Sequence, residues 1–412
     1  MILSFSDNMR VSQDVLNTQG LPFQAGIPVS TNLFFNRKKE LNELKTVFLS
    51  IKKGVRQDVA LISPRRFGKT SLLLKLKEEL EKEDIVVIYF DCSKVFPFSI
   101  ENFLEIYIKE TLSVFCKKEG WKILPSRIAD AVAGSPEAVT DVVASLVSII
   151  GVEFGDFMKI WFQVKKREKK PSALFESALD LPERLSKKTG LTTFVIFDEF
   201  QLLKEFDKDF FWALRARMQE HKRTAYAIAG SSIGLMNEIV STKGSPFYNM
   251  FLVRTLKPFE DKDAIDFLKQ RFKSANFSID EDGLVAIMEK SGNIPFYLQW
   301  LGLNSYLLAL HLKKRTITKE IVDSAYANGL LTIPQFEREF GVFTKTQQMV
   351  LIIMAIKKFT RPVDIAREMN KRETNISREL RELVRYGYVI KTKDGYKILD
   401  QVFADWLRMR FS

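Results

Sequence analysis

Cysteine is scarce in this chain, with only Cys92 and Cys116 among its 412 residues. Two cysteines cannot build the disulfide framework that stabilises small secreted domains, so a reducing, cytoplasmic environment is expected. The start of the sequence also lacks the pattern of a secretory signal, because residues 1–10 carry Asp7 and no sustained apolar core. These absences exclude the disulfide-rich secreted proteins and give no indication of export.

Long apolar runs are absent too. The longest, residues 138–152, is shorter than the roughly 20 residues that a helix needs to cross a bilayer, and it contains Asp141. We therefore expect a buried helix there and no membrane association. The sequence does contain 46% hydrophobic residues, enough for well-packed cores. Its length predicts two or three domains, and no internal repeat is visible.

Positive charge is concentrated towards the end of the chain. The formal net charge is +12, and residues 341–412 hold 15 Lys and Arg against 8 Asp and Glu, a balance of +7. A basic segment favours an anionic partner such as nucleic acid. A Lys-rich surface typical of thermophilic proteins is the alternative, and charge alone does not decide between the two.

Short apolar runs predict the strands of a sheet. They do not alternate between apolar and polar residues, and helical stretches separate them, which is typical of a parallel sheet with helices on both faces. The predicted fold class is therefore α/β. A long helical stretch, about residues 100–188, contains a basic run at 165–170 that is either a solvated face or a nucleic-acid contact. The predicted strands are residues 58–62, 85–91, 193–198, 224–230 and 253–256.

After Pro258 the strands stop and the pattern becomes helical. The turn at residues 332–334, with its proline, is interpreted as a hinge before a final compact unit. Apolar spacing predicts helices over residues 263–273, 281–290, 295–312 and 319–328.

The turn after the first strand carries the residues of a phosphate-binding loop. Residues 63–70 (SPRRFGKT) lie between a strand and a helix, as in the pattern G-x-x-x-x-G-K-[ST], with Ser63 in place of the first glycine. Gly68 lets the backbone approach phosphates, Lys69 places its charge on them, and Thr70 binds Mg²⁺. For the two arginines, contact with a neighbouring subunit, with phosphate or with solvent stays open. The predicted nucleotide-binding residues of the loop are Ser63, Pro64, Arg65, Arg66, Phe67, Gly68, Lys69, Thr70 and Ser71.

Acids and serines end two later strands. Asp198 is placed to hold Mg²⁺, and Glu199 to orient and deprotonate an attacking water as a general base. Ser231, with Ser232 as the second choice, is placed to reach the γ-phosphate or the water. Serines that begin a helix are also ordinary N-caps. The predicted catalytic residues are Lys69, Glu199 and Ser231, the predicted metal ligands are Thr70 and Asp198, and the predicted ligands are ATP and Mg²⁺.

Several motifs occur in a fixed order along the chain. They are residues 34–41 (FFNRKKEL), 63–72 (SPRRFGKTSL), 198–201 (DEFQ), 230–232 (GSS), 256–259 (LKPF) and 292–298 (GNIPFYL). This order resembles the archaeal ATPase family of the STAND class, relatives of AAA+ ATPases and of archaeal origin-recognition proteins. The resemblance implies that Arg37 and Pro295 contact adenine, although a proline also suits a helix start. The domains we expect are an arm at 1–25, a P-loop ATPase domain at 26–260, a helical lid at 261–335 and a winged helix at 336–412.

The chain departs from the family pattern at three glycines, which are replaced by Asn36, Ser63 and Asn293. Asparagine tolerates the left-handed backbone region better than most residues, so we expect the two asparagine turns to be retained. Serine needs a permissible φ, and we expect the first turn of the loop to differ slightly.

The C-terminal segment predicts a winged helix. It holds helices at 344–356, 361–369 and about 374–385, and then two strands around the turn at 393–395. In helix-turn-helix proteins the second helix of the motif enters the major groove. Winged helices also dock proteins, and Glu379 and Glu382 interrupt the basic face. The candidate DNA contacts are Ser377, Arg378, Arg381, Arg385, Lys391 and Lys393.

The sequence as a whole predicts a nucleotide-controlled switch. ATP and Mg²⁺ bind, a winged helix that contacts double-stranded DNA or a protein changes position, and hydrolysis resets it. Two alternatives stay open. One is a regulator in which ATP is mainly structural, and the other is a DNA-processing motor. A protein partner or self-association is compatible with each of them.

Overall fold

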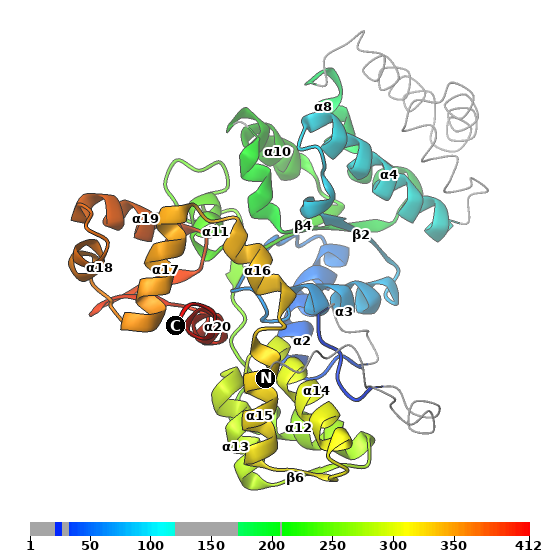
Figure 1. Ribbon diagram of the computed structural model, residues 1–412. Helices are drawn as coiled ribbons and strands as arrows, with labels where there is room; N and C mark the ends of the chain where they lie inside the picture. The colour runs from blue at the N-terminus through cyan, green and yellow to red at the C-terminus, as the bar shows by residue number, and fades with distance from the viewer. Residues whose placement is uncertain (1–20, 27–32, 120–171, 207) are drawn as a thin grey trace. The chain divides into compact units, whose positions relative to one another are not determined.

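Figure 1 shows the computed structural model of the chain, which describes residues 21–26, 33–119, 172–206 and 208–412. The chain forms two units. The sheet unit consists of Arg37–Pro64 and Lys69–Leu256, and the helical unit of Met1–Asn36, Arg65–Gly68 and Lys257–Ser412, each within its described part. The predicted helix at 138–152 and the basic run at 165–170 lie outside the described residues.

The sheet unit is built on a five-stranded sheet with the order β2-β3-β4-β1-β5. All neighbouring strands pair in parallel, which confirms the predicted α/β class. The carboxyl ends of β1, β3 and β4 therefore lie at the same edge of the sheet. The strands are β1 (Val59–Ile62), β2 (Ile85–Asp91), β3 (Thr192–Asp198), β4 (Thr224–Gly230) and β5 (Leu252–Arg254).

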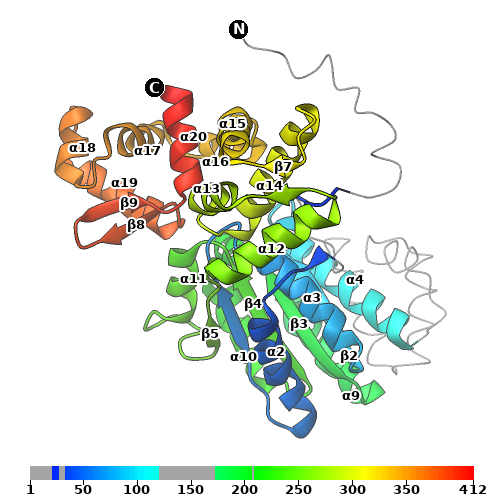
Figure 2. The ribbon, with the colours of Figure 1, turned by 90° about the horizontal axis from the view of Figure 1, so that it is seen from below.

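Helices cover both faces of this sheet because both faces are apolar. On one face, alternate strand residues such as Ile88 and Val195 share a core with five helices. On the other face, the ring of Phe48 in α2 (Lys38–Leu49) lies with its centroid 3.8 Å from that of Phe194, and α2 packs against α3 (Lys69–Glu81). Figure 2 shows α2 and α3 over this face. The five helices are α4 (Ile100–Glu119), α8 (Ser172–Leu179), α9 (Leu181–Thr189), α10 (Lys208–Glu220) and α11 (Ile233–Val240).

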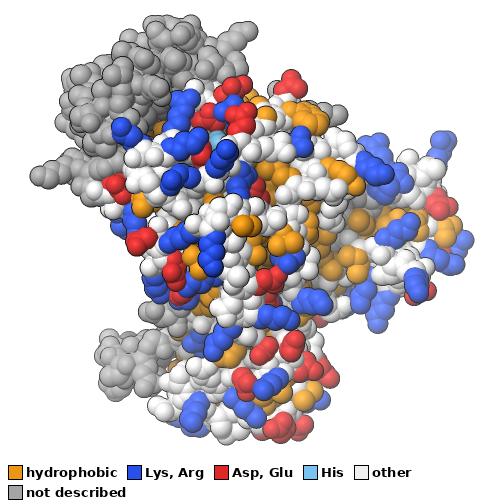
Figure 3. All heavy atoms as spheres, turned by 180° about the vertical axis from the view of Figure 1, so that it is seen from behind, with side chains coloured by type: hydrophobic (Ala, Val, Ile, Leu, Met, Phe, Trp, Pro, Cys, Tyr) orange, Lys and Arg blue, Asp and Glu red, His pale blue; other side chains and the backbone are white. Residues whose placement is uncertain are grey.

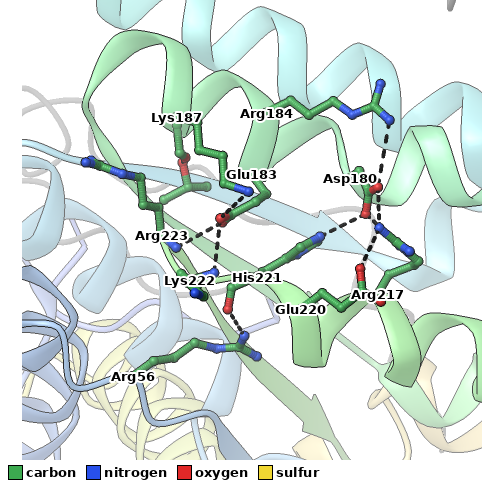
Figure 4. A network of polar contacts seen from close by, with 12 residues as sticks. Arg56, Asp180, Glu183, Arg184, Lys187, Arg217, Glu220, His221, Lys222 and Arg223 are labelled. Carbon is green, nitrogen blue, oxygen red and sulfur yellow. Dashed lines mark hydrogen bonds and ion pairs between the residues drawn. The ribbon is translucent and has the colours of Figure 1, made fainter.

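A network of polar side chains occupies the amino edge of the sheet (Figure 4). Asp180 accepts hydrogen bonds from Nε and Nη2 of Arg217 at 2.8 and 2.6 Å, and lies 3.0 Å from Nε2 of His221. Glu183 accepts the backbone N–H groups of residues 222 and 223, just before β4, at 3.0 and 2.9 Å. Burial acts to raise the pKa of both carboxyl groups, but these hydrogen bonds outweigh it and lower both pKa values.

After Pro258 the helical unit contains the predicted helices and also two strands that the sequence did not indicate. Two short strands, β6 (Ser278–Ile279) and β7 (Thr316–Ile317), pair in parallel, so the prediction that no strand follows Pro258 before the hinge is wrong. Phe23, which falls in the predicted N-terminal arm, is buried here and lies so close to Gly302 that any side chain at 302 would overlap its ring. The helices are α12 (Asp261–Ser274), α13 (Glu281–Ser291), α14 (Pro295–His311) and α15 (Lys319–Leu330).

The C-terminal elements follow the predicted order with two additions. A helix that the sequence pattern did not reveal, α16 (Pro334–Gly341), follows the turn at 332–334, and another, α20 (Gln401–Phe411), ends the chain and packs against α17. Between them lie α17 (Lys345–Lys357), α18 (Pro362–Glu368), α19 (Glu373–Arg385) and the antiparallel hairpin of β8 (Val389–Thr392) and β9 (Gly395–Ile398). In the part of the chain that the structure describes, no helix is long and apolar enough to cross a membrane.

Candidate nucleotide-binding site

The phosphate loop joins β1 to α3, which begins at Lys69. Gly68 has a φ of 85°, a conformation that favours glycine, so the loop requires this glycine for its backbone. Lys69 is buried, and its Nζ donates hydrogen bonds to the backbone carbonyls of Ser63 and Pro64 at 2.9 and 3.1 Å. The ammonium group therefore lies beside the residues that enter the loop, at the N-terminus of α3.

The residues that replace the three glycines adopt backbone conformations that their side chains allow. Asn36 and Asn293 have φ values of 58° and 56°, which confirms that asparagine retains the two left-handed turns. Ser63 is not among the described residues with a positive φ, so a serine fits the first position of the loop without backbone strain. The two asparagines therefore hold left-handed turns, and the backbone at Ser63 does not need a left-handed φ.

The end of β3 presents Asp198 to the first turn of α3. Its Oδ2 accepts hydrogen bonds from the hydroxyl of Thr70 at 2.8 Å and of Tyr89 at 2.6 Å, and its Oδ1 accepts the backbone N–H of Glu199 at 2.9 Å. Burial and the charge of Glu199 raise the pKa of Asp198 despite these hydrogen bonds. Sequence reasoning missed Tyr89, because an apolar run does not reveal the β2–β3 register that brings its hydroxyl to Asp198.

Thr70 and Asp198 offer the ligand atoms that Mg²⁺ prefers. A hydroxyl and a carboxylate oxygen lie 2.8 Å apart, and Mg²⁺ usually completes its shell with water and substrate phosphate oxygens. Among the described residues, no group of three or more His, Cys, Asp and Glu could hold a metal ion by itself. The residues present therefore fit a magnesium ion that arrives with a nucleotide.

Glu199 follows in a left-handed conformation, with φ 52° and ψ 40°. Its Oε2 accepts hydrogen bonds from the hydroxyl of Ser231 at 2.8 Å and from the amide of Gln201, the second residue of η4 (Phe200–Glu205). Ser231 was predicted to reach phosphate or water, and in the structure its hydroxyl binds the predicted general base. Ser232 occupies the N-cap position of α11 but makes no side-chain capping bond.

Residues 34–301 match the protein family described as an ATPase domain predominantly from Archaea. The chain belongs to this family. Two uncharacterised ATP-binding proteins of Methanocaldococcus jannaschii are 31% and 33% identical to this chain over 78 residues, which is 19% of its length. The chain spans only 22% and 21% of the length of these two relatives.

Solved structures share the fold of this chain. A Walker-type ATPase of Pyrococcus abyssi gives a TM-score of 0.66 at 18% identity, over 94% of this chain and all (100%) of its own. The ORC2 protein of Aeropyrum pernix gives 0.54 at 13% identity, over 97% and 98% of the two chains. The ORC1 protein of the same organism, solved in complex with DNA, gives 0.50 at 13% identity, over 91% and 93%.

The two arginines of the loop contact the helical unit of the ATPase, to which they belong. The buried guanidinium group of Arg66 donates hydrogen bonds to Glu339 at 2.7 Å and Asp400 at 3.1 Å. Arg65 lies 4.9 Å from the ring centre of Tyr388 and donates to its hydroxyl. Phosphate, solvent and a neighbouring subunit were the expected partners, but Arg66 pairs with carboxylates of its own chain.

The two residues expected at adenine fall in different units. Arg37 precedes α2 in the sheet unit and donates a hydrogen bond to Glu40 at 2.9 Å. Pro295 is the first residue of α14 in the helical unit, as the alternative of a helix-start proline requires. Their contact with adenine stays a prediction.

The C-terminal candidates lie on one amphipathic helix and on the hairpin. In α19, Ile376, Leu380 and Leu383 are buried. Figure 3 shows Lys and Arg side chains gathered over the C-terminal segment, at the right of that view. Of the predicted DNA contacts, Arg378, Arg381, Lys391 and Lys393 are exposed, whereas Ser377 and Arg385 are half-buried.

Proposed function

We propose that this chain binds ATP with Mg²⁺, hydrolyses it to ADP and phosphate, and acts as a nucleotide-controlled switch. The observation that carries the proposal is the placement of Glu199 directly after Asp198, whose carboxylate bonds Thr70 in the first turn of the loop helix. A base, a pair of metal-binding oxygens and a phosphate loop thus share the carboxyl edge of one sheet. Membership of an ATPase family supports the same reaction.

Each of the site residues in the sheet unit has a separate role in the proposed hydrolysis. Backbone N–H groups at the start of α3 bind phosphate oxygens, and Lys69 exchanges its two carbonyl partners for the β- and γ-phosphates. When bound by Thr70 and Asp198, Mg²⁺ supplies positive charge next to the phosphate oxygens. Glu199 orients a water and accepts its proton as the water oxygen bonds the γ-phosphorus and the bond to the bridging oxygen breaks.

Phosphate release by purified protein tests the enzyme proposal. The variant Glu199→Gln keeps the size of the side chain but cannot accept the proton, so we expect turnover to fall by about 10²- to 10⁴-fold. Binding of a fluorescent ATP analogue should stay within about twofold, because Glu199 is not placed on the phosphates. Equal phosphate release by the two proteins would reject hydrolysis and leave ATP with a structural role.

We further propose that residues 336–412 form a winged helix that binds double-stranded DNA. The exposed cations of α19 and of the β8–β9 hairpin support this, as does the likeness in fold to an ORC1 protein solved with DNA. A gel shift at increasing salt, with Arg378→Ala plus Arg381→Ala, tests it. Loss of two phosphate contacts should weaken binding and lower the slope of log affinity against log salt by about 2. Equal and salt-insensitive behaviour would favour a protein partner.

A further inference from the structure

Glu199 receives two side-chain hydrogen bonds on the same oxygen. The hydroxyl of Ser231 and the amide Nε2 of Gln201 both donate to Oε2. Two donors fix the plane and the direction of a carboxylate much more tightly than one. Among the described residues both donors bind Oε2, which leaves Oε1 to accept a proton from water.

We propose that Gln201 is a positioning residue that aims the carboxylate of Glu199 at the attacking water, with Ser231 as its partner and Gly230 as the residue that makes room for it. The inference rests on the proposed function, since it assigns Gln201 a role in that hydrolysis. Gln201 itself touches neither ATP nor the water in this proposal and acts only through Glu199.

The burial of Gln201 supports a role beyond packing. The residue is 4% exposed, and its Oε1 finds no hydrogen-bond partner within the described chain. Burying an amide oxygen without a partner costs free energy, which an apolar side chain of the same size would avoid. A glutamine differs from such an apolar side chain in having an amide N–H group, and this group donates a hydrogen bond to Glu199.

Gly230 supplies the space that the amide occupies. A Cβ at this position would lie 2.4 Å from Oε1 of Gln201 and 2.4 Å from Sδ of Met236, closer than real contacts allow. The φ of Gly230 is not in the left-handed region, so the backbone does not require a glycine here. The glycine at the end of β4 therefore leaves space for Met236 and for Gln201, which lies 29 positions earlier in the chain.

The backbone of Glu199 is in an unfavourable conformation that its surroundings must stabilise. A glutamate at φ 52° and ψ 40° lies in a sparsely populated region, and such residues persist only where their surroundings determine them. The bonds from Gln201 and Ser231 connect the side chain of Glu199 to η4 and to the end of β4, two segments that the sheet holds in place. Removing one donor frees the carboxylate to turn.

The test removes the donor and keeps the volume. In Gln201→Met we expect kcat for phosphate release to fall by about 10- to 100-fold, because a small displacement of a catalytic group has effects of this size. KM and the affinity for a fluorescent ATP analogue should change by less than about twofold. Ser231→Ala should show the same split, and Ser231→Thr, which keeps the hydroxyl, should recover most of the rate.

The decisive control repeats Gln201→Met in the Glu199→Gln protein. If Gln201 acts only through Glu199, the residual rate of the double variant equals that of Glu199→Gln alone. A further drop there, or a loss of analogue binding in Gln201→Met, would mean a general structural role and overturn the inference. A Gln201→Met protein as active as wild type would overturn it too. Should that variant fold poorly, Ser231→Ala against Ser231→Thr decides in the same way.

The proposed function fails on a different result. If wild type and Glu199→Gln release phosphate equally, hydrolysis by Glu199 is rejected whatever Gln201 does. If wild type is active, Glu199→Gln is inactive and Gln201→Met is fully active, hydrolysis stands and only the role of Gln201 is lost.

Discussion

Buried carboxylates lie at both edges of the sheet, and the two edges use them differently. At the amino edge, Asp180 and Glu183 accept hydrogen bonds from arginine, from histidine and from backbone N–H groups, and their pKa values are lowered. At the carboxyl edge, burial and the neighbouring Glu199 raise the pKa of Asp198, whose side-chain donors are the neutral hydroxyls of Thr70 and Tyr89.

We infer from this difference in pKa that the carboxylates Asp180 and Glu183 stabilise the fold, whereas Asp198 serves ligand binding. A carboxylate that meets cations and backbone N–H groups lowers the free energy of the folded state at neutral pH. A buried carboxylate that meets only neutral donors and another acid raises it, and natural proteins keep such groups where a ligand will bind. Asp58 is an exception at the amino edge. Burial raises its pKa, although Arg56 and the backbone N–H of Tyr226 donate hydrogen bonds to its carboxylate.

The same substitution at each edge should have opposite consequences. For Asp198→Asn we expect phosphate release to fall by about 100-fold or more, because one of two metal-binding oxygens loses its charge. The midpoint of thermal unfolding should change little or rise, since a buried charge beside Glu199 is removed. Phosphate release and calorimetry on one preparation measure both. A clear loss of stability with full activity would reverse the assignment of this edge.

Asp180→Asn is the matched change at the amino edge. We expect the free energy of unfolding to drop by about 2 kcal/mol, because the bidentate bond with Arg217 and the contact with His221 are weakened. The kcat of the folded protein should match wild type. Urea unfolding followed by circular dichroism gives the first quantity. A reduced kcat without a loss of stability would connect this network to the site.

Glu183→Gln asks how much of that stability comes from backbone donors. A neutral amide has one acceptor oxygen for the N–H groups of residues 222 and 223, so we expect a loss of about 1 kcal/mol in the free energy of unfolding. Glu183→Leu serves as the harsher comparison and should cost more. If the glutamine variant is as stable as wild type, these two hydrogen bonds contribute little.

Acid should remove the stability that Asp180 and Glu183 give the amino edge. The folded-state pKa values of Asp180 and Glu183 lie below their unfolded values, so their contribution is complete above about pH 5 and is lost as pH falls through the folded values. Unfolding midpoints between about pH 6 and 3 should therefore fall less steeply in the variant that carries both Asp180→Asn and Glu183→Gln. Parallel curves for the two proteins would contradict this account.

Local patterns predicted the parts of the molecule that are set locally. The five strands, the loop before α3 and the left-handed turns at Asn36 and Asn293 follow from apolar runs and from the conformational range of single residues. Thr70 and Asp198 were predicted as ligands of one metal ion, and in the structure a hydrogen bond joins their side chains. The adenine and DNA contacts stay predictions.

The features that could not be predicted from the sequence depend on the register between strands and on contacts between residues far apart in the chain. Tyr89 reaches Asp198 through the pairing of β2 with β3, which no single strand reveals. The partners of Arg66 lie 273 and 334 positions further along the chain. The helix α20, which provides one of these partners as its N-cap, was missed because the winged-helix pattern ends with the hairpin.

The contacts of Arg66 set a limit on how this ATPase can be divided. The family match ends at residue 301, yet the arginines of the phosphate loop are held by Glu339, Tyr388 and Asp400. A fragment cut at the end of the match would leave the tip of the loop without these partners while keeping every residue of the sequence motif. The segment that sequence similarity delimits is therefore shorter than the set of residues that holds the two arginines of the loop.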